Sequence, residues 1–195
     1  YRSREKLAWE FATILNQEAR ELEAAGVDVI QFDEPAFNVF FDEVADWGIA
    51  ALERACEGLK AETVVHICFG YGIKANNDWK ATLGAQWRHY EKSFPLLQAS
   101  SIDTVSLESH HSNVPLEVVE LVRGKRVMLG AIDVANDAVE TPEEVAQTLR
   151  NALEFVDADK LIASTNCGMA PFRRDVALAK LSALSAGAGI LREEL

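Results

Sequence analysis

TVVHICF, residues 63–69, is an apolar run of β-branched and aromatic residues that carries a histidine and a cysteine two positions apart. This composition predicts a buried β-strand. Alternate residues of a strand point to the same face, so His66 and Cys68 project together while the apolar residues between and around them point the other way. An imidazole and a thiol on one face are half of the ligand set of a zinc site.

Two further residues are candidates for that ligand set. Cys167 lies in a glycine-containing turn, TNCGM at 165–169, and Glu108 ends the strand-like stretch TVSLE at 104–108. A catalytic zinc site takes about three protein ligands and keeps a position for substrate. Taken singly, a histidine or cysteine in such a place is more often a structural residue of the core. Together the residues favour a metal site.

Composition bounds the class of protein. The chain has 195 residues, 49% of them hydrophobic and 26% charged, as in an ordinary globular protein. The three cysteines, without a secretory signal, predict a reducing, cytoplasmic compartment, with Cys56 as a helix core residue. No apolar run approaches the roughly 20 residues of a membrane span. The net charge of −12 argues against nucleic acid and anionic membranes as partners and leaves a small-molecule substrate.

Helical and strand patterns alternate along the chain. Apolar residues at helical spacing predict a helix over 3–25, which stops at Gly26. Strands are predicted at 27–34, 63–69, 104–108, 126–133 and 161–166, and helical segments at 42–59, 79–98, 115–122, 141–155 and 174–186. Thr141, before a proline and two glutamates, is expected to cap its helix.

Repeated βα units predict an α/β fold with a parallel sheet, either a doubly wound sheet or a (β/α)8 TIM barrel. The polar residues favour the barrel, because they fall at the carboxyl ends of five different strands. A barrel gathers such ends round one mouth, whereas an open sheet spreads them apart. These residues are Asp33, His66, Cys68, Glu108, Asp133 and Cys167.

Five strands are fewer than the eight that a barrel requires. We therefore expect residues 1–195 to form the C-terminal part of a single barrel, supplying strands four to eight. The first three strands are expected upstream in a longer protein.

Five short motifs, in this order and spacing, resemble those of the catalytic barrel of cobalamin-independent methionine synthase. They are QFDEPA at 31–36, HIC at 66–68, SLES at 106–109, GAID at 130–133 and NCG at 166–168. The resemblance covers nearly the whole chain. It implies a zinc-dependent methyltransferase that forms methionine from homocysteine.

The resemblance also assigns roles to residues. It implies that His66, Cys68, Glu108 and Cys167 bind Zn²⁺ and that Asp33 holds the amino group of homocysteine. Bound zinc would convert the substrate thiol, which is mostly protonated at neutral pH, into a nucleophilic thiolate. For Asp33 the alternative is a turn residue before Pro35.

Three other residues have open assignments. Asp133 either contacts substrate or a metal ligand, or caps the helix that follows its strand. His110 and His111 directly follow the Glu108 strand and could line the mouth or donate hydrogen bonds to a ligand. The alternative for both histidines is an ordinary loop position.

The chain departs from the folate-dependent members of the family at two positions. A histidine thought to protonate the departing folate is replaced by Ala135, and a glutamate that contacts folate is replaced by Val39. Loss of one general acid typically lowers the rate by about 10²–10⁴. Either His110 or His111 substitutes, or the donor is not 5-methyltetrahydrofolate. The two losses favour another donor, such as a corrinoid protein or another activated methyl compound.

Two other functions stay open. The first is a zinc-thiol alkyltransferase of the coenzyme M methyltransferase type, related to uroporphyrinogen decarboxylase. Asp33 argues against it, because a carboxylate suits an ammonium group rather than a sulfonate. The second is a closed, structural zinc site in a barrel without enzymatic activity, which would have no room for an exogenous thiol.

Overall fold

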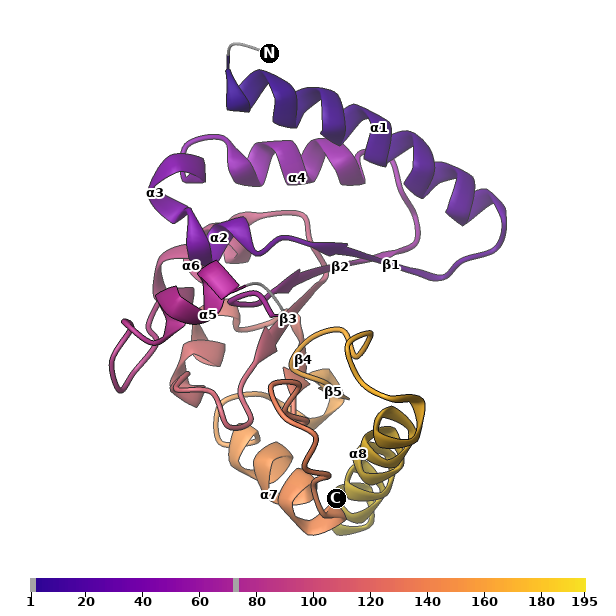
Figure 1. Ribbon diagram of the computed structural model, residues 1–195. Coiled ribbons are helices and arrows are strands. Elements are labelled where there is room, and N and C mark those ends of the chain that lie inside the picture. Colours follow the sequence, from indigo (N-terminus) through magenta and orange to yellow (C-terminus); the bar gives the residue numbers. More distant parts are fainter. Residues whose placement is uncertain (1–2, 72–73) are drawn as a thin grey trace.

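The structure, a computed structural model, describes residues 3–71 and 74–195 and has one parallel sheet (Figure 1). The sheet order follows the chain order, and the strands are β1 (Val29–Asp33), β2 (Glu62–Ile67), β3 (Thr104–Glu108), β4 (Arg126–Gly130) and β5 (Leu161–Ser164). All five predicted strands are confirmed. A doubly wound sheet reverses its strand order at a switch point. The unbroken order is therefore that of a barrel segment.

Helices fill the connections between the strands. The α-helices are α1 (Arg4–Ala24), α2 (Ala36–Val39), α3 (Phe41–Val44), α4 (Gly48–Cys56), α5 (Lys74–Lys80), α6 (Tyr90–Ala99), α7 (Pro142–Ala152) and α8 (Arg174–Glu194), and the 3₁₀ helices are η1 (Leu116–Val122) and η2 (Ala158–Lys160). Right-handed crossovers between strands in consecutive order place their helices on one side of the sheet. Thr141 caps α7 as predicted, in a capping box with Glu144.

Two predicted helices are interrupted. Residues 42–59 divide into parts of α3 and α4, and residues 79–98 divide between α5 and α6 around an irregular segment. In that segment Gly84 has φ +73°, a left-handed conformation that ends a helix. Before α4, Gly48 lies so close to Phe37 that a Cβ at Gly48 would be 2.7 Å from the phenyl ring.

Other boundaries also differ from the prediction. Residues 116–122 form a 3₁₀ helix in which three of seven residues are valine, a residue that loses side-chain freedom in an α-helix. Helix α8 runs to Glu194 rather than ending at 186. Strand β4 ends at Gly130 rather than at Asp133. At Gly130 the side chain of Asn166, from the turn after β5, lies close to the backbone.

The two faces of the sheet differ in polarity. One face is apolar and packs into the main core with the helices, through Val65, Ile67, Val105, Leu107, Val127 and Leu129. The other face carries His66, Ser106 and Glu108, which are all buried. This alternation agrees with the predicted strand pattern, in which the apolar side meets the helices and the polar side faces the barrel axis.

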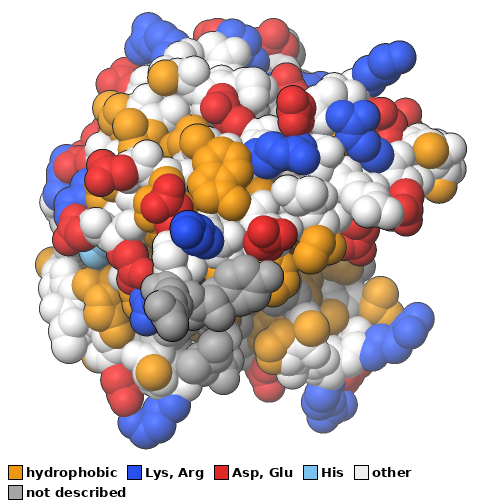
Figure 2. Space-filling model, turned by 90° about the horizontal axis from the view of Figure 1, so that it is seen from above, with side chains coloured by type: hydrophobic (Ala, Val, Ile, Leu, Met, Phe, Trp, Pro, Cys, Tyr) orange, Lys and Arg blue, Asp and Glu red, His pale blue; other side chains and the backbone are white. Residues whose placement is uncertain are grey.

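Strands β1 and β5 are the two edges of the sheet. Val29 on β1 is 50% exposed, and helix α1 exposes Phe11, Ile14, Leu15 and Leu22. Seen from above, apolar side chains lie among charged ones of both signs (Figure 2). Among residues 3–71 and 74–195, none of the helices combines the length and hydrophobicity that a bilayer span requires.

We predict opposite effects for two glycines of α8. A Cβ at Gly187 would lie 2.5 Å from Val145 Cβ and 2.6 Å from the Pro142 carbonyl oxygen on α7, whereas nothing lies within 4 Å at Gly189. Gly187→Ala should lower the free energy of unfolding by about 1–3 kcal/mol, because the added methyl group would force α7 and α8 apart. Gly189→Ala should raise it by up to about 1 kcal/mol, because alanine favours the helix.

Urea denaturation of both variants of the purified protein tests this pair. Equal midpoints for the two variants would contradict the close packing of α7 on α8.

Candidate metal centre

Three side chains that are distant in sequence meet at the carboxyl end of the sheet. His66 lies on β2, Cys68 directly follows that strand, and Cys167 lies in the turn after β5. The nitrogen and sulfur atoms that they offer all lie within 4.8 Å of one another. His66 and Cys68 are buried, and Cys167 is half-buried. The structure therefore brings together three of the four predicted ligands.

The His66 ring is oriented by the neighbouring strand. Its Nδ1 is 2.8 Å from Ser106 Oγ, and Ser106 is its register partner on β3. Its Nε2 is buried and has no hydrogen-bond partner among the described residues. Buried polar atoms nearly always have a partner, so an unpaired nitrogen beside two thiols fits a metal ligand.

The two thiols interact directly. Their Sγ atoms are 3.7 Å apart. The hydrogen bond with Cys68 lowers the pKa of Cys167, and His66 adds to this effect, while the same contact raises the pKa of Cys68. The pair therefore loses its first proton readily and its second with difficulty. A divalent cation would supply the charge that both thiolates require.

Glu108, the fourth predicted ligand, ends β3 and is fully buried. Its carboxylate is not in the group formed by His66, Cys68 and Cys167. Instead Oε1 accepts a hydrogen bond from the Phe69 backbone N–H at 2.8 Å, and Oε2 accepts one from the Tyr71 hydroxyl. Burial raises the pKa of Glu108, although both hydrogen bonds oppose the shift.

The turn that carries Cys167 is attached to the loop after β3. The fully buried Asn166 accepts a hydrogen bond from the Ser109 N–H at 3.0 Å and donates one to the His110 carbonyl at 2.7 Å. Thr165 Oγ1 donates to the Cys167 carbonyl at 2.8 Å. The position of Cys167 therefore depends on the segment that follows Glu108.

Asp133 is buried in the loop after β4. Its N–H donates to Glu140 Oε1 at 2.9 Å, and its own carboxylate accepts from the Ala135 N–H at 2.7 Å. Glu140 in turn forms a fully buried ion pair with Lys180 of α8 at 3.1 Å. The helix-cap interpretation of Asp133 is wrong, because the residue closes a turn of its own loop and Thr141 caps α7.

The two histidines after Glu108 have different surroundings. Their rings stack, with centroids 3.9 Å apart. His110 Nδ1 is 2.9 Å from Thr148 Oγ1 on α7. His111 is exposed, with Nδ1 3.6 Å from Asp133 Oδ2, and its φ of +56° is unusual for a residue other than glycine. The structure therefore brings His111, and not His110, to the Asp133 carboxylate.

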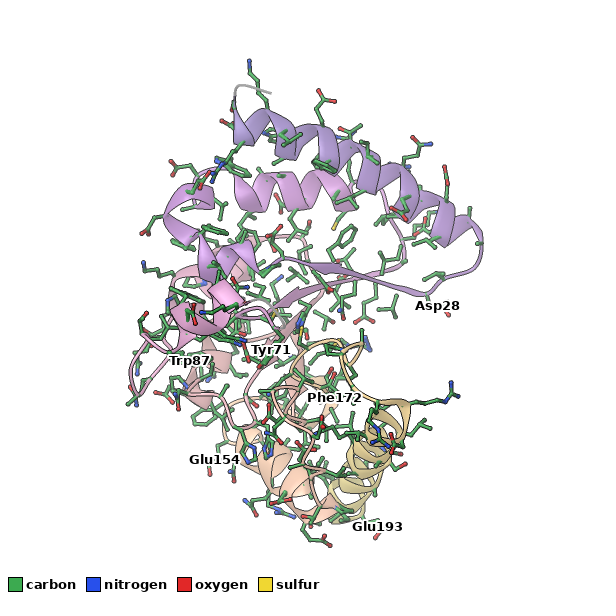
Figure 3. The ribbon with its side chains drawn as sticks, in the orientation of Figure 1. Asp28, Tyr71, Trp87, Glu154, Phe172 and Glu193 are labelled. Carbon is green, nitrogen blue, oxygen red and sulfur yellow. The ribbon has the colours of Figure 1, made fainter. Side chains whose placement is uncertain are left out.

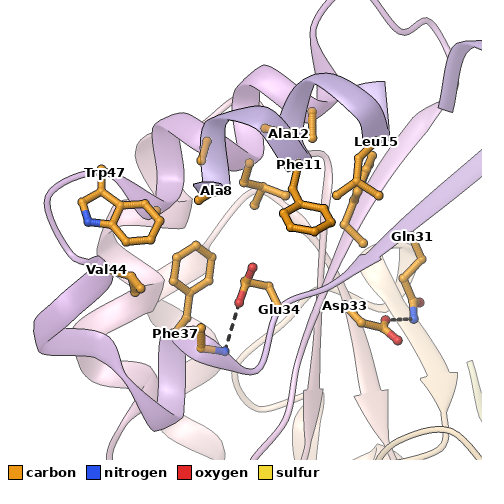
Figure 4. A pocket seen from close by; sticks show the side chains of 16 residues that line it. Ala8, Phe11, Ala12, Leu15, Gln31, Asp33, Glu34, Phe37, Val44 and Trp47 are labelled. Carbon is orange, nitrogen blue, oxygen red and sulfur yellow. Dashed lines mark hydrogen bonds between the residues drawn. The ribbon is translucent and has the colours of Figure 1, made fainter. Parts of the chain in front are cut away.

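Asp33 ends the edge strand β1 and is exposed. It is the register partner of His66, so both lie at the same level of the sheet. Its Oδ1 accepts a hydrogen bond from Gln31 Nε2 at 2.8 Å (Figure 4).

A groove of about 400 Å³ lies between α1, β1 and the segments α2 to α4 (Figure 4). Gln31, Asp33 and Glu34 are among its lining residues, and most of the lining is apolar, including Phe11, Phe37 and Trp47. None of the three clustered ligands lines it. The groove is therefore separate from the candidate metal centre.

Several residues of the site were not identified from the sequence. Tyr71 lies near the middle of the molecule, in the loop after β2 (Figure 3), where no periodic pattern marks it. Lys180 carried a signal, because it shares helical spacing with buried residues of α8, among them Ala183, Gly187 and Leu191. A lysine on such a stripe requires a buried partner.

Comparison with known proteins identifies relatives along the whole chain. Residues 1–189 match the family model described as the cobalamin-independent synthase, catalytic domain. Proteins named methionine synthase from Sulfurisphaera tokodaii and Saccharolobus islandicus are 31% and 32% identical to all of this chain, which covers 52% and 54% of them. The chain thus spans about half the length of the curated relatives it matches.

Solved structures agree with this result. A B12-independent methionine synthase from Shewanella sp. W3-18-1, in complex with selenomethionine, is 72% identical with a TM-score of 0.96, over 100% of this chain and 57% of that one. A putative vitamin-B12-independent methionine synthase from Listeria monocytogenes, 18% identical with a TM-score of 0.65, shares the fold over 95% of this chain and 55% of that one. The predicted α/β barrel, of which this chain supplies a part, is confirmed.

We predict that bound zinc changes the alkylation rates of Cys68 and Cys167 but not that of Cys56. In protein freed of metal with a chelator, iodoacetamide at pH 7 should modify Cys167 first. Its pKa is lowered, and it is half-buried whereas Cys56 and Cys68 are buried. Added zinc should slow modification of Cys167 and Cys68 by at least about tenfold. Cys56 should stay unmodified in both samples, because burial raises its pKa to about 12.

Mass spectrometry of the digested protein measures each site. Modification of Cys167 at the same rate with and without zinc would contradict a metal centre at this position.

Proposed function

Because this chain belongs to the family of cobalamin-independent synthase catalytic domains, we propose that the protein transfers a methyl group to the thiol of homocysteine and forms methionine. The observation that carries the proposal is the cluster of His66, Cys68 and Cys167, with the unpaired Nε2 of His66 beside two thiols. Family membership favours this reaction over an alkyltransferase of the coenzyme M type.

We further propose Zn²⁺ as the metal. Imidazole and thiolate are the ligands that zinc prefers, and three of them fit a catalytic rather than a closed site. When bound, zinc would lower the pKa of the substrate thiol and present it as a thiolate. Ser106 would hold the His66 ring through Nδ1 so that Nε2 stays directed at the site. Glu108, on the neighbouring strand end, is proposed as a fourth ligand that leaves the metal when the substrate thiol binds.

Asp33 is proposed to bind the ammonium group of homocysteine. It lies at the carboxyl end of β1 at the level of His66, and its carboxylate is anchored by Gln31 rather than by a cation. An anchored carboxylate can still accept hydrogen bonds from an ammonium group. This arrangement supports an amino acid, rather than a sulfonate, as the substrate.

Binding of the methyl donor is proposed to differ from that of the folate-dependent members. Ala135 offers no acid, and its N–H is bonded to Asp133. Val39 on α2 offers no polar contact to a pterin. We therefore propose a donor other than 5-methyltetrahydrofolate. The comparisons give no support to a corrinoid partner, because the family and its solved member are described as independent of cobalamin and B12.

The remaining strands of the barrel are proposed to lie upstream of this chain in the full protein. Two features support this. Strands β1 and β5 are sheet edges, and α1 and the groove beside β1 expose apolar side chains. Exposed strand edges and apolar surfaces of this kind are normally covered in a complete domain.

We predict that zinc and activity depend on the same two cysteines. The purified full-length protein should contain about one zinc ion per chain and methylate homocysteine. Cys68→Ser and Cys167→Ser should each lose the metal and the activity, because an alcohol is a poor ligand for zinc. The control, Cys56→Ser, should keep both. Metal analysis and a methyl-transfer assay measure the two properties.

Several methyl donors are offered in the same assay. Full zinc occupancy in Cys68→Ser and Cys167→Ser would refute the metal assignment. Efficient cobalamin-free turnover of 5-methyltetrahydrofolate would refute the proposed donor difference while leaving the reaction in place.

A second prediction concerns Asp33. Asp33→Asn should weaken homocysteine binding by about 2–4 kcal/mol, because the ammonium group loses its charged partner, and should leave zinc in place. Asp28→Asn, just before β1 at its opposite end, is the control and should bind as the unaltered protein does. Calorimetric titration measures the affinity. Unchanged binding by Asp33→Asn would return this residue to the turn interpretation.

A further inference from the structure

The carboxylate of Glu108 has two hydrogen-bond partners of different kinds. The Phe69 N–H, just beyond β2, donates to Oε1 and belongs to the backbone, so it cannot turn away. The Tyr71 hydroxyl donates to Oε2 from a side chain, which can rotate. One oxygen is thus held permanently by the loop after β2, and the other is held by a partner that can be exchanged.

Tyr71 is itself held by a cation. Lys80 of α5 places its Nζ 3.8 Å from the centroid of the Tyr71 ring and donates a hydrogen bond to the Gly70 carbonyl at 2.7 Å. A cation over an aromatic face is attracted to it, and the second contact fixes the backbone beside the ring. The Tyr71 hydroxyl is thereby directed at Glu108 and not at solvent.

The position of Glu108 relative to the three clustered ligands matters for the chemistry. The carboxylate lies outside the group whose atoms are all within 4.8 Å of one another. Four tight protein ligands would make a closed, structural zinc site, whereas three leave a position for a substrate thiol. Whichever group holds Oε2 therefore influences whether the fourth position is taken by protein or by substrate.

We propose that Tyr71 is a positioning residue that competes with the metal for the Glu108 carboxylate and so makes the fourth coordination position available to the substrate thiol. This inference rests on the proposed metal centre. The hydroxyl and the metal compete for the same oxygen, because a carboxylate oxygen bonded to a phenol is a weaker donor to a cation. Lys80 maintains the competition by keeping the Tyr71 ring in place.

The test compares Tyr71→Phe with the unaltered full-length protein, using Co²⁺ as a spectroscopic substitute for zinc. Without the hydroxyl, Glu108 is released to the metal, so the dissociation constant for Co²⁺, measured against a competing chelator, should fall by about tenfold. The absorption change on adding homocysteine should need a concentration about tenfold higher, because the carboxylate occupies the thiol position.

Two further variants separate this role from a general structural one. In a Glu108→Gln background, Tyr71→Phe should have no effect on either affinity, because a neutral amide does not compete. Lys80→Met should shift both affinities in the same direction as Tyr71→Phe, because the ring loses its anchor.

The outcomes separate the role of Tyr71 from the proposed metal centre on which it rests. Metal and thiol affinities of Tyr71→Phe within about twofold of the unaltered protein would overturn the role of Tyr71 and leave the metal centre intact. Failure of the unaltered protein to bind Co²⁺ through its cysteines would overturn both.

Discussion

Parallel pairing of neighbouring strands in chain order is the constraint on which the rest of the structure depends. It brings the carboxyl ends of all five strands to one edge of the sheet. The register then sets His66 beside Ser106 and Glu108 beside Gly130. As a result, Cys68 and Cys167 are 3.7 Å apart although 99 residues separate them in the chain. No local interaction could assemble this group, so the candidate metal centre exists only when the sheet does.

Polar groups buried at that edge have to be compensated, and the compensation ties the site to the stability of the fold. An unpaired buried group costs about 1–3 kcal/mol. Asn166 satisfies the backbone of Ser109 and His110, and Lys180 satisfies Glu140, which holds the Asp133 loop. Against this background the unpaired Nε2 of His66 matters because it lies beside the two thiols of Cys68 and Cys167, whereas the other unpaired buried atoms of the described residues, such as Nε2 of His110, lie outside that group. It is the part of the site that calls for an external ligand.

The open side of the sheet has the opposite character. Asp33 lies on the edge strand β1 and is exposed, although its register partner His66 is buried. The apolar groove beside the same strand is likewise uncovered. The candidate metal centre is formed by β2, the residue that follows it and the turn after β5, with Ser106 of β3 beside His66, whereas the proposed substrate site lies at the margin. The described residues therefore supply the candidate metal ligands, whereas the surroundings of the proposed substrate site depend on what covers β1.

The sequence by itself determined the five strands, the barrel-type order and the three residues of the His66, Cys68 and Cys167 cluster, because period-two alternation and polar residues at strand ends are local signals. It also identified Thr141 as a helix cap. Tertiary structure alone decided the partners of those residues. Three contacts join elements that are distant in the sequence: Glu108 with Tyr71, Asn166 with Ser109, and Lys180 with Glu140. The positive φ of His111 was likewise visible only in the structure. Hydrogen bonds of this kind depend on distances between strands and loops, and no spacing along one chain segment encodes them.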